Sequence, residues 1–254
     1  IRDRSGISSE LGMAEIYRDL GLKGEKIIVA VLDSGIDASH KDMRVSPGSE
    51  KFSKNEIEKL KKENKISYGL YSSDKVPFAY NYADGNNKVK EAFSTSPGYS
   101  HGMHVAGIIG ANCASEEEIK NKKGIRGIAP EVQLYNMKIF SNDPNKGASE
   151  GDIVQAIEDA IKLKADVINM SLGMSAGFTN PSDLQQEAIK KAREQNVIVV
   201  TAGGNAAFST YPNEDNRSID NGTVATPGLS LDSIQVASFD NKKKTAVSYT
   251  HLRA

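Results

Sequence analysis

The chain has 254 residues, of which 38% are hydrophobic and 26% charged, and this is enough for one large α/β domain or two small ones. Lys and Arg total 32 against 33 Asp and Glu, so no basic excess indicates nucleic acid or an anionic membrane as a partner. No apolar run approaches the roughly 20 residues of a membrane span.

The two ends and the single cysteine also limit the interpretation. The chain starts at Ile1 rather than at Met and shows no signal peptide, so we interpret it as an interior part of a longer protein. Cys113 is the only cysteine, which excludes a disulfide within the chain. We expect it to be a small core residue late in the helix that starts at His101.

Helical and strand patterns alternate along the chain and predict an α/β fold with a mostly parallel sheet. The predicted helices cover residues 10–20, 51–65, 101–111, 182–196 and a segment that Ser149 caps, and the predicted strands cover 27–32, 132–139, 166–170, 197–202 and 234–238. The charged run 51–65 is interpreted as a solvated face, and Glu187 and Lys191 as an i,i+4 ion pair. Residues 43–98 are rich in charge, Gly, Asn, Ser and Tyr, and we expect a surface insertion between two core elements.

Asp33 and His101 are the first candidates for catalysis. Asp33 follows a continuously apolar strand, at the sheet edge where chemistry collects in parallel sheets. His101 stands between a polar loop and a helix of small residues, where a general base meets both a substrate and a partner. A carboxylate at Asp33 would fix the tautomer of the imidazole. Asp37 and Asp42 compete for that role, and each candidate also has an ordinary structural interpretation, as a turn cap or a satisfied histidine.

Three further residues follow from the motifs. His104 stands three residues after His101, which permits a metal site, although a bare H-x-x-H is weak support for one. Ser171 follows a buried strand and superficially resembles the serine of a nucleophile elbow, but Asn169 replaces the first glycine of that motif. Asn205 follows two glycines after another buried strand, which suits an oxyanion site or a plain turn.

Six stretches in a fixed order carry a family pattern. They are Val29–Asp37, His40–Met43, Ser100–Gly107, Arg126–Pro130, Val167–Gly173 and Gly203–Asn205. In this order they resemble the subtilisin-like serine peptidases (subtilases), and most closely the cell-envelope proteinase branch that includes lactocepins and C5a peptidase. The resemblance implies a three-layer subtilisin-like fold with a mostly parallel central sheet flanked by helices, incomplete at its C-terminus.

The resemblance also implies roles for individual residues. Asp33 orients His101, and His101 is the general base of a serine endopeptidase that acts through an acyl-enzyme. Asn205 donates to the oxyanion of the tetrahedral intermediate. The backbone of Ser171, Leu172 and Gly173 pairs with an extended polypeptide substrate. The chemistry requires no cofactor or metal, and although structural calcium is frequent in the family, no Asp-rich loop here assigns a site.

Three departures from the family pattern stand out. Met103 replaces a Thr, Gly203 replaces an Ala, and the G-T-S-M-A-x-P motif that carries the nucleophilic serine is absent. We therefore expect a partial catalytic domain at 1–247, followed by a non-native or truncation tail at 248–254, and a fragment that is inactive alone with part of its sheet exposed. The parent would be secreted or attached to the cell wall of a Gram-positive bacterium.

Two other interpretations remain open. One is a non-catalytic pseudoprotease that binds peptides. The other is a different hydrolase, with either a metal at His101 and His104 or an α/β-hydrolase nucleophile at Ser171.

Overall fold

The computed structural model describes residues 20–91, 100–174, 179, 182–205, 224–240 and 245–247. Its centre is a parallel sheet of six strands in the order β2-β3-β1-β4-β5-β6. The bounds are β1 Ile28–Asp33, β2 Phe78–Asn81, β3 Gln133–Lys138, β4 Val167–Met170, β5 Ile198–Ala202 and β6 Ile234–Val236. The α/β fold with a parallel sheet and flanking helices is therefore confirmed.

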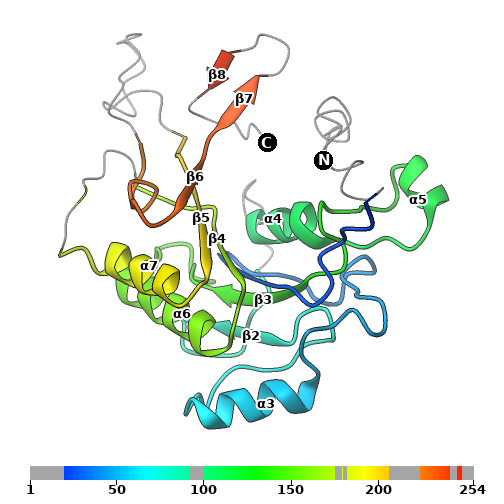
Figure 1. Cartoon of the computed structure of the whole chain (residues 1–254), viewed down its shortest axis with the longest axis horizontal. Helices are drawn as coiled ribbons and strands as arrows, with labels where there is room; N and C mark the ends of the chain where they lie inside the picture. The colour runs from blue at the N-terminus through cyan, green and yellow to red at the C-terminus, as the bar shows by residue number, and fades with distance from the viewer. Residues whose placement is uncertain are drawn as a thin grey trace.

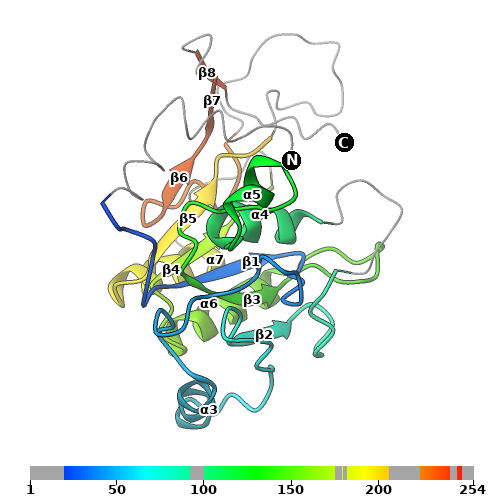
Figure 2. The same ribbon diagram turned by 90° about the vertical axis from the view of Figure 1, so that its right-hand side faces the viewer.

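Helices cover both faces of this sheet (Figure 1). They are α3 Lys54–Glu63, α4 His101–Gly110, α5 Glu116–Lys120, α6 Glu150–Lys162 and α7 Leu184–Glu194. Figure 2 shows α4 on one side of the strands and α6 on the other. A separate antiparallel pair is formed by β7 Ser238–Asp240 and β8 Thr245–Val247.

The central strand β1 divides its side chains between the two layers, because successive residues of a strand point to opposite faces. Ile28, Ala30 and Leu32 pack into the core that α6 and α7 cover. Val29 and Val31 pack on the side of Ala106 in α4. All six residues of β1 are buried, as the continuous apolar run 27–32 predicts for a strand with helices on both faces.

The segment 43–98 is not only a surface insertion, and that expectation is wrong for part of it. Residues 78–81 form β2, which pairs in parallel with β3. The charged run also does more than face solvent, because Ile57 and Leu60 of α3 are buried in the core. The buried side chain of Gln133 fastens the segment to the sheet by accepting hydrogen bonds from the amides of Lys51 (2.8 Å) and Phe52 (2.9 Å).

Two local expectations are wrong, and two concern residues that lie outside the described part of the chain. Cys113 is buried, but it lies after the end of α4 rather than in it. Lys191 pairs with Glu158 of α6 at 3.0 Å, so the ion pair links two helices rather than one helix turn to the next. The helix predicted at 10–20 and the tail at 248–254 lie outside the described residues, apart from Leu20.

Candidate active site

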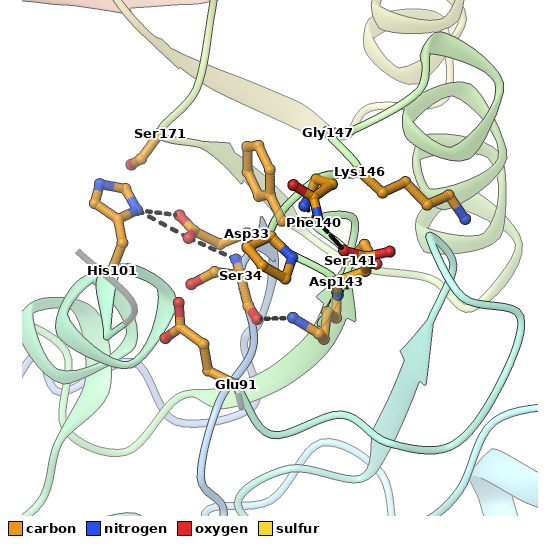
Figure 3. A pocket seen from close by; sticks show the side chains of 13 residues that line it. Asp33, Ser34, Glu91, His101, Phe140, Ser141, Asp143, Lys146, Gly147 and Ser171 are labelled. Atoms are coloured by element: carbon orange, nitrogen blue, oxygen red, sulfur yellow. Dashed lines mark hydrogen bonds and ion pairs between the residues drawn. The ribbon is translucent and has the colours of Figure 1, made fainter. Parts of the chain in front are cut away.

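Asp33 and His101 meet at the carboxyl end of the sheet. Asp33 is the last residue of β1 and only 2% exposed, and His101 is the first residue of α4. The Nδ1 atom of His101 lies 2.8 Å from Oδ1 and 3.0 Å from Oδ2 of Asp33. Because Nδ1 faces the carboxylate, Nε2 is the ring nitrogen left for proton exchange with another group. Figure 3 shows Nε2 pointing away from Asp33.

The residues next to this pair hold the two elements together. The backbone amide of Ser34 donates to Oδ1 of Asp33 at 2.7 Å, which fixes the carboxylate. The amide of Gly102 donates to Oγ of Ser34 at 2.8 Å, which ties the first turn of α4 to the turn after β1. The hydrogen bond with Asp33 raises the pKa of His101, burial opposes this rise, and the charges of Asp33 and Glu91 add to it.

A cavity of about 460 Å³ opens beside the pair. Its lining comes from the ends of β1, β3 and β4, from the segment before α4, from the start of α4 and from the loop after β3. The lining residues are Asp33, Ser34, Glu91, His101, Lys138, Phe140, Ser141, Asp143, Pro144, Asn145, Lys146, Gly147 and Ser171. Figure 3 shows Ser171 across from the His101 ring. The structure thus brings Asp33, His101 and Ser171 to one cavity.

The stretch Ser171–Gly173 leaves the sheet directly after β4. Oγ of Ser171 donates to Oδ1 of Asn169 at 3.1 Å, and Leu172 packs against the core. Beyond it, Met174 pairs in antiparallel fashion with Thr226, through hydrogen bonds of 3.0 and 2.9 Å. A Cβ at Gly173 would stand 2.7 Å from the Cβ of Ala225, so the glycine lets these two segments approach each other.

Asn205 stands after β5, beyond a turn of two glycines. Gly204 has a φ of +105°, a conformation that favours glycine, and a Cβ there would meet Ala225 at 2.9 Å. The amide of Gly203 donates to the carbonyl of Val236 at 2.7 Å. Asn205 is exposed and follows the carboxyl end of β5, the same edge at which β1 and β4 end, although it is not among the residues that line the cavity.

Two charged residues at the site, Lys138 and Glu91, were not predicted from the sequence. Lys138, at the end of β3, is 1% exposed, and its Nζ donates to the carbonyl of Ser34. Burial lowers the pKa of Lys138, which nearby carboxylates partly restore. Glu91 presents a buried Oε2 without a hydrogen-bond partner, and burial raises the pKa of its carboxyl to about 7. A charge at the end of the otherwise buried strand 133–138 is the one hint that could have identified Lys138.

One group of candidate metal ligands lies outside the cavity lining. Within the described ranges, the only group of three candidate ligands is Asp42, Cys113 and Glu118, whose ligand atoms lie within 4.8 Å of one another. The ammonium of Lys41 already contacts Asp42 (3.1 Å) and Glu118. Calcium prefers an all-oxygen shell, so a thiol and an ammonium do not fit it. His101 and His104 belong to no such group in the described part of the chain.

Two curated proteins are similar to most of this chain. The PII-type proteinase of Lactococcus lactis subsp. cremoris is 38% identical over 241 residues, which cover 92% of this chain but 12% of the relative. The C5a peptidase of Streptococcus pyogenes serotype M18 is 34% identical over 238 residues, which cover 90% of this chain and 19% of the relative. The chain thus spans less than a fifth of these relatives.

Solved structures give the same fold. The protease domain of PatA, in a mutant form, superposes with a TM-score of 0.57 at 21% identity, covering 90% of this chain and 63% of that one. The prenylagaramide maturation protease PagA gives 0.57 at 20% identity, covering 93% and 62%. No helix among the described residues has the length and apolar character needed to cross a bilayer. The model of the subtilase family (Peptidase S8) matches residues 24–252, and the chain therefore belongs to that family.

Proposed function

We propose that the complete protein is a serine endopeptidase in which Asp33 orients His101 and His101 acts as the general base. The hydrogen bond of 2.8 Å between Nδ1 of His101 and Asp33 carries this proposal. It holds one tautomer and aims Nε2 at the cavity, where that nitrogen takes the proton of a serine and returns it to the leaving amine. Polypeptides are the proposed substrates.

The remaining roles belong to the same proposal. The amide of Asn205 donates to the oxyanion of the tetrahedral intermediate, and the backbone of Ser171, Leu172 and Gly173 pairs with the substrate as an added strand. In subtilisin, the reference case for this interaction, loss of the oxyanion donor lowers kcat by about 10²–10³. The chemistry uses side chains and backbone amides and needs no cofactor.

The nucleophile must come from sequence that this chain does not contain, because no G-T-S-M-A-x-P motif occurs in it. We therefore propose that these 254 residues alone form no acyl-enzyme. Secretion to, or attachment at, the cell envelope of a Gram-positive bacterium is proposed from the family branch, in which the relatives come from Lactococcus, Lacticaseibacillus and Streptococcus.

A fluorescent fluorophosphonate tests the mechanism in the full-length protein. We expect labelling of one serine, loss of labelling in His101→Ala, and no change in His40→Ala, which removes an exposed histidine outside the site. Asn205→Ala should lower kcat about 10²–10³-fold with little change in KM. The 254-residue chain should stay unlabelled.

Other outcomes would decide for the alternatives. A label on Ser171 would indicate an α/β-hydrolase mechanism. Peptidase activity that a chelator abolishes, without any phosphonate label, would indicate a metal. Peptide binding with neither label nor turnover would indicate a non-catalytic pseudoprotease.

A further inference from the structure

Four ionisable groups from four parts of the chain converge at the cavity. Asp33 comes from the end of β1, Lys138 from the end of β3 and His101 from the start of α4. Glu91 comes from the segment that precedes α4 in the chain, and it lines the same cavity. The proposed mechanism uses only two of the four.

The position of Glu91 is held by close backbone packing. Gly35 has a φ of +125°, and a Cβ there would stand 2.5 Å from the carbonyl of Val89 and 3.1 Å from the amide of Glu91. The turn after β1 and the segment 89–91 thus lie directly against each other. Figure 3 shows the carboxyl of Glu91 pointing toward Ser34 and the start of α4.

One of the two carboxyl oxygens of Glu91 has no hydrogen-bond partner, although Ser34 hydrogen-bonds to the same carboxyl group. Its Oε2 is buried and accepts no hydrogen bond. A buried carboxylate oxygen without a donor is costly when it carries charge, and it is much less costly when the carboxyl is protonated. Among the described residues, Lys138 makes no close ion pair with Glu91; its Nζ donates to the carbonyl of Ser34 and acts on Glu91 through its charge.

We propose that Glu91 is a positioning residue for His101: its carboxyl and the His101 imidazole share one proton, in a cluster with Asp33 and Lys138. This inference rests on the proposed function, because it takes His101 as the catalytic base. The ammonium of Lys138 offsets the carboxylate of Asp33. With one proton between them, either Glu91 and His101 are both neutral, or Glu91 is a carboxylate and His101 an imidazolium. The net charge of the cluster is zero in both states.

The electrostatics of the individual groups support this arrangement. Burial raises the pKa of Glu91 to about 7, while Ser34, Lys138 and His101 lower it and Asp33 raises it. The pKa of His101 is raised by its hydrogen bond with Asp33 and by the charges of Asp33 and Glu91. The two pKa values rise together, and each group is a cause of the other's shift, which is the condition for a coupled pair. The charged groups that face the cluster from other elements are Asp84, after β2, and Asp143 and Lys146, after β3.

Glu91 should therefore determine the pH above which His101 can act as a base. A base must be neutral to accept the proton of a nucleophile. An ionised Glu91 stabilises the imidazolium form of His101, so that His101 becomes a neutral base only at higher pH. Without that charge, His101 becomes neutral at lower pH, so the acid limb of kcat/KM of the full-length enzyme should move to lower pH in Glu91→Gln.

The first test uses the unmodified 254-residue chain, which needs no nucleophile. NMR titration of the His101 ring and of the Glu91 carboxyl carbon should give two broadened curves that overlap, with the Glu91 curve centred at about pH 7. A Glu91 carboxyl that titrates at the ordinary glutamate value, together with a single-site curve for His101, would overturn the proposal.

Variants give the sign of the interaction. Glu91→Gln should lower the pKa of His101, because the charge of Glu91 contributes to its rise, and Lys138→Met should raise it. Glu194→Gln, on the exposed side of α7, is the matched control and should leave it unchanged. An unchanged His101 pKa in a folded Glu91→Gln variant contradicts the proposal. Because none of these readouts involves the serine, failure of the peptidase mechanism would show separately, in the phosphonate experiment.

Discussion

Gly102 lies against the turn that follows β1 and has no room for a side chain. A Cβ at this position would stand 2.6 Å from the carbonyl oxygen of Gly35 and 3.1 Å from Oδ1 of Asp33. The close approach is what lets the amide of Gly102 reach Oγ of Ser34 and lets the neighbouring His101 reach Asp33. A sequence motif that places glycine after the histidine thus has a steric reason.

Substitution of this glycine should separate His101 from Asp33. We expect Gly102→Ala to push α4 away from Asp33, to cost about 1–3 kcal/mol of unfolding free energy and to lower the pKa of His101. The pKa falls because the hydrogen bond with Asp33 is the main cause of its rise. Urea unfolding and NMR titration of His101 measure the two effects.

Gly107→Ala in the same helix is the control for that substitution. A Cβ there meets nothing within 4 Å, so the helix should gain about 0.5–1 kcal/mol and the His101 pKa should not change. If the two variants behave alike, close packing at Gly102 does not hold the pair together.

At the scale of elements, apolar periodicity predicted the sheet better than the segments around it. The strand predicted at 27–32 and β1 (Ile28–Asp33) differ by one residue, because a continuous β-branched run has few alternatives. The strand β2 was missed, since Phe78–Asn81 is short and lies in a polar segment, and its pairing with β3 supplies the reason for its conformation.

The pairing of Asp33 with His101 could be predicted from motifs, whereas the charges around the pair could not. Asp33 and His101 are each identified by the residues next to them in the sequence. Glu91 and Lys138 reach the cavity only because β1, β3 and the segment before α4 converge, and no spacing along the chain reports that convergence. The pairing of Lys191 with Glu158 likewise depends on the packing of α7 on α6.

A buried lysine fastens the segment before β2 to the turn before β3. Lys75 is 1% exposed, and its Nζ donates to the carbonyl of Pro130 at 2.7 Å. Burial lowers the pKa of Lys75 to about 7, with Glu131 opposing the shift. Between that pH and the ordinary value of 10.5, the unfolded chain keeps a proton that the folded chain has released.

This difference predicts how stability depends on pH. Above about pH 7 the folded state should gain up to about 1.4 kcal/mol per pH unit from Lys75, whereas below it the full penalty of burying the cation remains. Lys75→Met should lose that slope, while Lys62→Met, at an exposed position of α3, should keep it. Urea unfolding at pH 6.5, 7.5 and 8.5 compares the three proteins, and equal slopes would show that Lys75 stays protonated in the fold.

At the scale of the whole molecule, the two faces of the sheet differ in how far they are covered. Ile234 of β6 points to the same face of the sheet as Val200 of β5 and Val31 of β1. This is the face on which α4 packs. That helix covers β1 and β3, while Ile234 and Val236 of β6 remain 56% and 53% exposed. The expected apolar exposure of the sheet is therefore present at β6.

An apolar sheet surface of this kind should bind dyes and associate. We expect the chain to enhance the fluorescence of the dye ANS and to show concentration-dependent association in analytical ultracentrifugation. The double variant Ile234→Thr/Val236→Thr should reduce both signals and change the unfolding free energy by no more than about 0.5 kcal/mol per site, because both side chains are already exposed and threonine suits a strand.

Val199→Thr is the matched control: its side chain points to the opposite face of β5 and is 1% exposed. It should cost about 1–3 kcal/mol through an unpaired hydroxyl and leave dye binding by the folded protein unchanged. Unaltered association in the double variant would place the adhesive surface elsewhere, and a large loss of stability would mean that β6 is covered in solution.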